Sequence, residues 1–313
     1  MNKTAELYNL TQQVQGQVFY AAVTTHISDE ARQAWMERSP LMNLKRGYAE
    51  SPGWVLVQAL EFAPDPLTVK RFRQRAVYSS PSLTNALFEV MASEQLFDRA
   101  EDGYHLTEKG QAEADKIQHF RVTTFAGFEP IPLDDITRMN AYLQRVLQAS
   151  LAVDMPTWCL EHSQRRMPAE SAPPLSFLVQ YGSDFNALRD DAHMAAYSKY
   201  DVDGHIWEAF SYINTNQAQS TSDLYEQLAY RGFYTEDWQA ALADLTKRGW
   251  VSQTEEIYSV TDKGRTVYED VEQQTDVYFY SGWDVLSEDE FTDLIHLMTA
   301  LRDACQALTA QPA

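Results

Sequence analysis

Apolar residues recur at helical spacing along most of the chain, and short strand-like segments interrupt this pattern in two places. In the first stretch the pattern predicts a helix up to Phe62, a short charged helix over 69–76 and a third helix ending near Met91. Two short strands over 96–99 and 104–106 follow, with Asp102-Gly103 as the hairpin turn between them. Another helix is expected over 108–123.

The same pattern returns about 154 residues later, between Trp207 and Gly264. The closing phrases match best, with Tyr104-His105-Leu106-Thr107-Glu108-Lys109-Gly110 in the first stretch and Tyr258-Ser259-Val260-Thr261-Asp262-Lys263-Gly264 in the second. A pattern repeated at a fixed spacing indicates one structural unit used twice. Three helices followed by a hairpin predict a winged helix-turn-helix, so we expect two copies in tandem.

The rest of the chain predicts helices that join the two copies. Amphipathic helices are expected over 5–25, 133–151 and 286–308, and another from Ser28 to Pro40. The helices over 133–151 and 286–308 have apolar positions 155 residues apart, so we expect them to pack together around a pseudo-two-fold axis. The predicted fold is therefore mainly α with small β-hairpin wings, a tandem winged helix-turn-helix forming an intrachain pseudo-dimer. Its predicted parts are a first half over 1–153, a linker region over 154–188, where Pro, Ala and Ser are frequent, and a second half over 189–313.

Composition predicts a cytoplasmic protein without a membrane partner. No run of about 18 apolar residues is present, and the N-terminus lacks the apolar core of a signal peptide. The two cysteines, Cys159 and Cys305, lie far apart without motif spacing, which is typical of a reducing compartment. Either a monomer or a homodimer is compatible with these features.

Three phrases of the first copy match a known family: Leu67-Thr68-Val69, Ser79-Ser80-Pro81-Ser82-Leu83-Thr84-Asn85-Ala86-Leu87 and the closing phrase from Gly103 to Gly110. With these phrases the first copy resembles the MarR family of regulators. The resemblance implies binding to double-stranded DNA through the third helix, which carries small polar residues near its start. The expected base or phosphate contacts are Ser80, Ser82, Thr84 and Asn85, and the expected basic contacts are Lys70, Arg71, Arg73, Arg75 and Arg99. Helix capping by Ser80 or Ser82, and a solvated basic face, are the structural alternatives.

The second half contains four further phrases that match a known family: Arg189-Asp190-Asp191-Ala192-His193, Arg231-Gly232-Phe233 with Trp238, Leu245-Thr246-Lys247-Arg248-Gly249-Trp250, and Thr275-Asp276 with Trp283. With these phrases the second half resembles another bacterial helix-turn-helix family. This copy departs from a DNA reader, because Glu236, Asp237 and Trp238 occupy the expected recognition helix and Glu255-Glu256 the wing tip. We therefore expect the second copy to be degenerate.

Charge opposes a DNA function at long range, since the formal net charge is -20. Residues 45–120 carry nine bases against eleven acids, about -2, whereas residues 200–275 carry five against fourteen, about -9. A regulator that binds DNA through its first copy is the preferred interpretation. The alternative is a protein that kept the fold, lost DNA binding and binds a small apolar ligand or a protein partner.

Aromatic residues are dense in the second half. Trp207, Tyr212, Tyr230, Trp238, Tyr280 and Trp283 are candidates to line a pocket for a small aromatic or apolar effector. Core packing is the favoured explanation of the same residues, because aromatic side chains dominate protein cores.

Catalytic and metal-binding patterns are weak. Cys159 and His162 have a ligand-like spacing without a second pair, and Asp201-Val202-Asp203-Gly204-His205 is better explained as a turn with a helix cap. No phosphate loop, nucleophile elbow or HExxH motif occurs. We expect neither enzyme activity, nor a cofactor, nor a bound metal.

Overall fold

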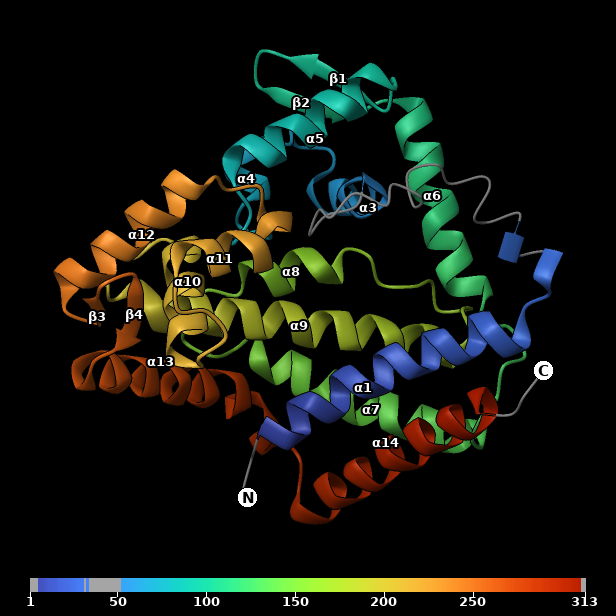
Figure 1. Cartoon of the computed structure of the whole chain (residues 1–313). Helices are drawn as coiled ribbons and strands as arrows, with labels where there is room; N and C mark the ends of the chain where they lie inside the picture. Colours follow the sequence, from blue (N-terminus) through green and yellow to red (C-terminus); the bar gives the residue numbers. More distant parts are fainter. Residues whose placement is uncertain (1–4, 31, 34–51, 311–313) are drawn as a thin grey trace. The chain divides into compact units, whose positions relative to one another are not determined.

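The computed structural model describes residues 5–30, 32–33 and 52–310 (Figure 1). These residues are mainly helical, with two small antiparallel hairpins among them. They belong to two compact units built from segments far apart in sequence: unit 1 from 1–43, 112–191 and 278–313, and unit 2 from 44–111 and 192–277. The compact units therefore do not follow the consecutive halves predicted from the sequence. The predicted helix from Ser28 to Pro40 lies largely outside the described residues.

Unit 1 is a helical assembly. It contains α1 (Ala5–Ala21), the π-helical turn η1 (Ala22–His26), α7 (Leu133–Ser150), α8 (Trp158–Gln164), η3 (Gly282–Val285) and α14 (Glu288–Thr309), with parts of α6 (Glu108–Thr123), α9 (Pro174–Ser198) and α13 (Asp262–Ser281). α1 (blue) packs along α14 (red), and α14 also contacts α7 (Figure 1). Arg145 Nη1 lies 2.6 Å from Glu290 Oε1, and Arg138 Nε lies 2.8 Å from Asp293 Oδ2. The expected packing of the helices over 133–151 and 286–308 is present.

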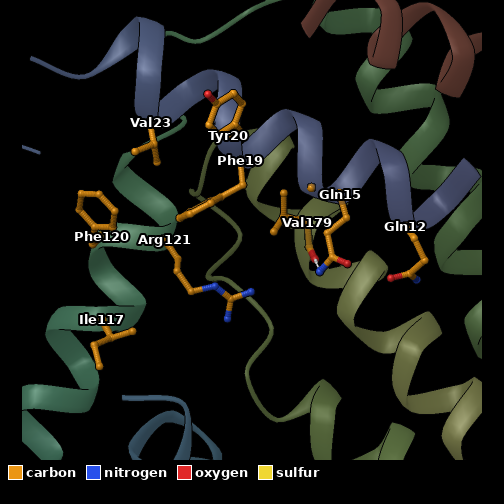
Figure 2. A pocket seen from close by; sticks show the side chains of 10 residues that line it. Gln12, Gln15, Phe19, Tyr20, Val23, Ile117, Phe120, Arg121 and Val179 are labelled. Atoms are coloured by element: carbon orange, nitrogen blue, oxygen red, sulfur yellow. Dashed lines mark hydrogen bonds between the residues drawn. The ribbon is translucent and has the colours of Figure 1, made fainter. Parts of the chain in front are cut away.

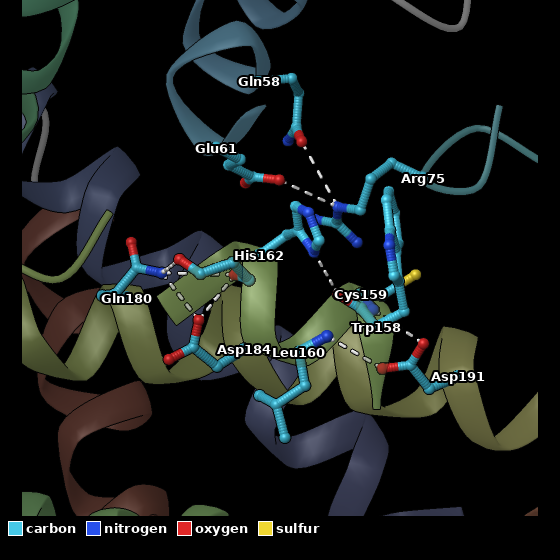
Figure 3. A network of polar contacts seen from close by, with 11 residues as sticks. Gln58, Glu61, Arg75, Trp158, Cys159, Leu160, His162, Gln180, Asp184 and Asp191 are labelled. Atoms are coloured by element: carbon cyan, nitrogen blue, oxygen red, sulfur yellow. Dashed lines mark hydrogen bonds and ion pairs between the residues drawn. The ribbon is translucent and has the colours of Figure 1, made fainter. Parts of the chain in front are cut away.

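Residues 154–188 are not a linker, contrary to the sequence prediction. Pro174 is the first residue of α9, where its missing N–H costs no helical hydrogen bond. Leu160 of α8 is fully buried, and the Asp191 carboxylate accepts hydrogen bonds from the N–H groups of Cys159 and Leu160, both at 2.9 Å (Figure 3). Proline is frequent both at the first turn of a helix and in linkers, so composition alone does not distinguish the two.

Unit 2 contains the same order of elements twice. The first head, residues 52–111, has α3 (Pro52–Phe62), α4 (Val69–Phe72), α5 (Pro81–Ser93), β1 (Phe97–Ala100), β2 (Gly103–Leu106) and the start of α6. The second head, residues 204–277, has α10 (Gly204–Asn214), α11 (Thr221–Gln227), the 3-10 turn η2 (Ala229–Arg231), α12 (Thr235–Arg248), β3 (Val251–Thr254), β4 (Ile257–Val260) and most of α13. The hairpins have matching registers, with Phe97 opposite Leu106 and Val251 opposite Val260.

The repeated closing phrase has the same hydrogen bonds in both heads. Thr107 Oγ1 accepts from the Gly110 N–H at 2.9 Å, and Thr261 Oγ1 accepts from the Gly264 N–H at 3.0 Å. Each threonine hydroxyl also donates to a carbonyl at the end of the preceding third helix, Gln95 O or Gly249 O, both at 2.7 Å. The matched sequence is therefore a structural clamp between the hairpin, the helix before it and the helix after it.

The glycines of this clamp leave space for a backbone carbonyl. A Cβ on Gly110 would lie 2.0 Å from Leu96 O, and a Cβ on Gly264 would lie 2.0 Å from Trp250 O. Both helices begin against the first strand of their hairpin at a distance that only glycine permits. The lysine of each phrase adds a hydrogen bond at 2.7 Å, from Lys109 Nζ to Glu94 O and from Lys263 Nζ to Arg248 O.

Candidate nucleic-acid interface

The third helix of the first head, α5, presents a small polar face to solvent. It begins after Ser80, whose Oγ accepts from the Leu83 N–H at 3.0 Å, and Pro81 occupies the first turn. Its apolar side is buried, as the helical spacing requires, through Leu83, Leu87, Phe88 and Met91. Ser82, Asn85 and Ala86 are exposed on the opposite side. Uncharged side chains of this kind can hydrogen-bond to base edges without repelling phosphate.

The structure separates the expected serine, threonine and asparagine contacts into two groups. Ser80 is 3% exposed and Thr84 is 0% exposed, and the Thr84 hydroxyl donates to Ser80 O at 3.2 Å. Ser80 fulfils the capping alternative, and neither Ser80 nor Thr84 is available to a duplex in this structure. Ser82 and Asn85 are the members of the set that α5 exposes.

The four basic residues 70–75 do not form an open basic patch. Arg71 Nη1 donates to Pro66 O at 2.6 Å, and Arg73 Nε donates to Ser79 O at 3.0 Å. Arg75 forms a buried pair with Glu61 at 3.2 Å, with side chains 7% and 0% exposed (Figure 3). Arg71 therefore holds the turn before α4, and Arg73 and Arg75 hold the turn between α4 and α5. The helix α4 ends at Phe72, where the sequence predicted a helix to residue 76.

Two basic side chains of the expected footprint remain exposed. Lys70 lies on α4, and Arg99 lies on β1, where it pairs with Glu89 of α5. The wing around Arg99 is itself acidic, because Asp98, Glu101 and Asp102 are exposed on it. Within the expected footprint, the exposed positive charge is therefore Lys70 and a partly neutralised Arg99.

The two heads join at the starts of their third helices. The Ser80 N–H donates to Arg231 O at 2.8 Å, and the Arg231 guanidinium lies 5.2 Å from the centre of the Tyr78 ring. Third helices that read two half-sites of straight DNA are separated by about 34 Å or a multiple of it. While this junction holds, α5 and α12 begin beside each other and do not have that spacing.

Gly232 of the junction has a left-handed backbone, with φ of 73°, and a Cβ there would lie 2.6 Å from Leu83 Cβ. Gly249 is a matched control, because its φ is also 73° but its Cβ would meet only Lys263 at 3.9 Å. We expect Gly249→Ala to lower the free energy of unfolding by about 1 kcal/mol, from backbone strain alone. Gly232→Ala should cost a further 1–3 kcal/mol, roughly, from the clash with α5. Thermal denaturation of both variants measures the difference, and equal losses would show that the contact between the heads does not stabilise unit 2.

A second ion pair lies beside the junction. Arg231 Nη2 is 2.7 Å from Glu208 Oε1, and Glu208 is 8% exposed. Burial raises the pKa of Glu208, and the nearby Arg231 charge opposes this only in part. The pair links α10 to the turn before α12, much as Glu61 and Arg75 link α3 to the turn before α5.

The second head presents an acidic face. Glu236 and Gln239 are exposed on α12, and Glu255 and Glu256 are exposed at the tip of the second hairpin. Asp237 caps α12, accepting from the Tyr234 N–H at 2.8 Å. These exposed carboxylates repel phosphate. That the second copy is degenerate for DNA binding stays a prediction.

The aromatic residues proposed as a pocket lie in two separate cores. Trp207 and Trp238 are buried in the core of the second head, with Tyr212 and Tyr230 packed against it. Tyr280 and Trp283 are buried in unit 1, where Trp283 stacks on Phe185 at 5.0 Å. The pocket interpretation of these six residues is therefore corrected to core packing.

Comparison with known proteins gives the class. The model of a helix-turn-helix family matches residues 123–312, more than half of the chain, and the chain belongs to this family. The match includes the second head and leaves out the first, where the sequence places the DNA contacts. Neither the curated proteins nor the solved structures yielded a match.

None of the helices within the described ranges is long and apolar enough to cross a membrane. Among the same residues, His, Cys, Asp and Glu side chains do not gather in a group of three or more that could hold a metal ion.

Proposed function

We propose that this protein is a cytoplasmic, DNA-binding transcriptional regulator of MarR-like type that acts as a single-chain pseudo-dimer without enzyme activity. The first head reads the DNA and the second head is degenerate. The observation that carries the proposal is the exposed face of α5, where Ser82 and Asn85 are uncharged in a chain with a net charge of -20. Membership of a helix-turn-helix family supports DNA binding at the coarse level.

A pseudo-dimer is supported by the terminal helices. Arg138 of α7 pairs with Asp293 of α14, and the two residues are 155 positions apart, which is the spacing of the repeat itself. Counterpart residues meet in this way at the axis of a two-fold dimer. Because α5 and α12 begin beside each other, the proposed operator is one short asymmetric site rather than two spaced half-sites.

The proposal is tested by titrating the protein against labelled fragments of its own genome at low and moderate salt. We expect selective retention that weakens as salt rises, because phosphate contacts release counterions. Sequencing the retained fragments then gives the operator. No retention at low salt would refute the proposal.

Lys70 is expected to contact phosphate. Lys70→Glu should reduce the steepness of log affinity plotted against log salt concentration by about 1. It should also lower the affinity for all DNA fragments by a similar factor. Lys70 is exposed in the first turn of α4, where a carboxylate is favourable to the helix, so the fold should tolerate the change. Arg265→Glu, which reverses an exposed charge on α13 of the second head, is the control and should leave the slope unchanged. If the two variants changed the salt slope equally, Lys70 would not be a specific phosphate contact.

A second candidate is a winged-helix protein that has lost DNA binding and recognises a protein or a small molecule. It is favoured by the exposed acids on both wings and by the arginines that the first head uses internally. This candidate predicts that Lys70→Glu and the salt concentration have no effect, because no DNA is bound at any salt concentration.

A further inference from the structure

Unit 1 contains a pocket of about 630 Å³ between α1, α6 and α9 (Figure 2). Polar side chains that line it are engaged within the fold. Arg121 of α6 donates to the Gln118 amide at 3.0 Å. Gln15 Nε2 of α1 donates to Val179 O of α9 at 3.3 Å (Figure 2). The first head, by contrast, has an ion pair on its exposed surface, between α5 and β1.

Glu89, the acid of this pair, continues the exposed face of α5. Ser82, Asn85 and Glu89 are three and four positions apart, and side chains at these spacings are neighbours on one face of a helix. The Glu89 side chain is 43% exposed. A group that is bound to Glu89 therefore lies at the edge of the proposed reading face.

Glu89 binds one residue from each strand of the wing. Arg99 of β1 pairs with Glu89 Oε2, and Tyr104 Oη of β2 donates to Glu89 Oε1 at 2.6 Å. Arg99 and Tyr104 are opposite each other in the hairpin. Burial and the hydrogen bond to Glu89 raise the pKa of Tyr104, so its hydroxyl is a donor at neutral pH. The carboxylate thus joins the wing to the reading helix.

Tyr104 fixes the position of this link within the head. Its ring packs edge-to-face on Phe88 of α5, with ring centres 5.2 Å apart. Its N–H donates to Leu67 O at 2.9 Å, and its carbonyl accepts from the Leu67 N–H at 2.8 Å. Leu67 precedes Thr68, the N-cap of α4. The wing, the reading helix and the start of α4 are therefore held together around one side chain.

The second head has its hairpin without this ion pair. The positions 154 residues after Glu89 and Arg99 hold Ala243 and Gln253. The strands β3 and β4 nevertheless pair in the same register as β1 and β2. A hairpin of this kind therefore folds without the pair, which suggests a role for the pair at the exposed surface of the first head.

The link sets the direction of the Arg99 side chain. Arg99 Nη2 bonds to Glu89 Oε2, while 60% of the arginine side chain stays exposed. A guanidinium carries its N–H donors in one plane, so fixing one nitrogen sets the direction of the others. An arginine without this partner would sample many rotamers and could contact phosphate on any sequence.

We propose that Glu89 is a positioning residue for DNA reading, which holds Arg99 of the wing in the orientation for a sequence-dependent contact beside the base contacted by Asn85. The inference rests on the proposed function of the first head and deepens it. An oriented arginine loses less conformational entropy on binding, so the contact favours the operator over other sequences. The Glu89 carboxylate itself contributes no attraction for DNA.

A double-variant cycle of Glu89→Gln and Arg99→Gln in the full chain tests the inference. The readout is the ratio of affinities for a fragment retained from the genomic pool and for its scrambled sequence, because general charge effects act on both alike. Arg99→Gln should lower this ratio about tenfold. Glu89→Gln should lower it about threefold or more, although the loss of a negative charge raises the affinity for the scrambled fragment. In the Arg99→Gln background, Glu89→Gln should leave the ratio unchanged.

Glu101→Gln is the matched control, because it removes an exposed acid of the same hairpin. It should raise the affinity for both fragments and leave their ratio unchanged. Glutamine at position 89 can still accept from the Tyr104 hydroxyl, so the melting temperature of Glu89→Gln should change little.

Two results would overturn the inference and leave DNA binding by the first head intact. One is an unchanged ratio in Glu89→Gln, and the other is an equal loss with and without Arg99. If the natural chain retained no fragment at all, the proposed function would be refuted and the inference with it.

Discussion

Gly264→Ala and Gly110→Ala are expected to be the most destabilising single substitutions among the glycines of the heads, each lowering the free energy of unfolding by about 3 kcal/mol or more. In each case the new Cβ would lie 2.0 Å from a backbone carbonyl oxygen, of Trp250 or of Leu96. A flexible side chain could move away, but here the neighbour is the start of a strand. Relief therefore requires the helix to move from its hairpin, which also breaks the hydrogen bonds of Thr261 or Thr107.

The control is Gly16→Ala, which is the same chemical change in a helix with open space around it. It should raise the free energy of unfolding by about 0.5–1 kcal/mol. Chemical denaturation of the three variants, followed by tryptophan fluorescence, gives the comparison. If Gly264→Ala and Gly16→Ala were equally stable, the clamp would not hold the hairpin as the structure indicates.

Arg231→Met is expected to have the second large effect. It should lower the free energy of unfolding by about 3 kcal/mol near pH 7. The substitution leaves Glu208 buried without its partner, and a buried carboxylate that loses its cation is costly. The double variant Glu208→Gln with Arg231→Met removes both charges and should recover most of the loss. Without such recovery, the destabilisation would come from the lost packing of Arg231 on Tyr78 and Tyr230.

The same variant should acquire a pH dependence of known sign. Burial already raises the pKa of Glu208 above its ordinary 4.5, and loss of Arg231 raises the pKa further. The folded state then holds the proton more tightly than the unfolded state. The Arg231→Met variant should therefore be closest to the natural protein below about pH 4.5 and lose stability as pH rises through the range above it. The double variant should lack this added dependence, and melting temperatures between pH 4.5 and pH 8 measure it.

Much of the fold was predictable because its signals are local. Helical spacing placed α5, α7 and α14, and the hairpins followed from short apolar runs and a turn, although the first turn is one residue earlier than Asp102-Gly103. The matched phrases ending at Gly110 and Gly264 predicted the repeat. The reason for the two glycines, a close approach to a backbone carbonyl, could not be predicted from the sequence because it depends on the three-dimensional fold.

The site was less predictable because it depends on contacts between distant residues. A run such as Lys70, Arg71, Arg73 and Arg75 has the same appearance in sequence whether it faces solvent or braces a turn. Here the partners of the arginines are Pro66 O, Ser79 O and Glu61, two of them carbonyl groups that residue types do not reveal.

The most direct test of the account compares Asn85→Ala with Gln239→Ala. The two residues occupy equivalent exposed positions, 154 apart, on α5 and α12, so the substitutions remove similar amide side chains from the two heads. The measurement is the ratio of affinities for a fragment retained from the genomic pool and for its scrambled sequence. The account predicts that Asn85→Ala lowers this ratio by about tenfold, as loss of a base contact should, and that Gln239→Ala leaves it unchanged. An unchanged ratio for Asn85→Ala, or a loss confined to Gln239→Ala, would contradict the assignment of DNA reading to the first head.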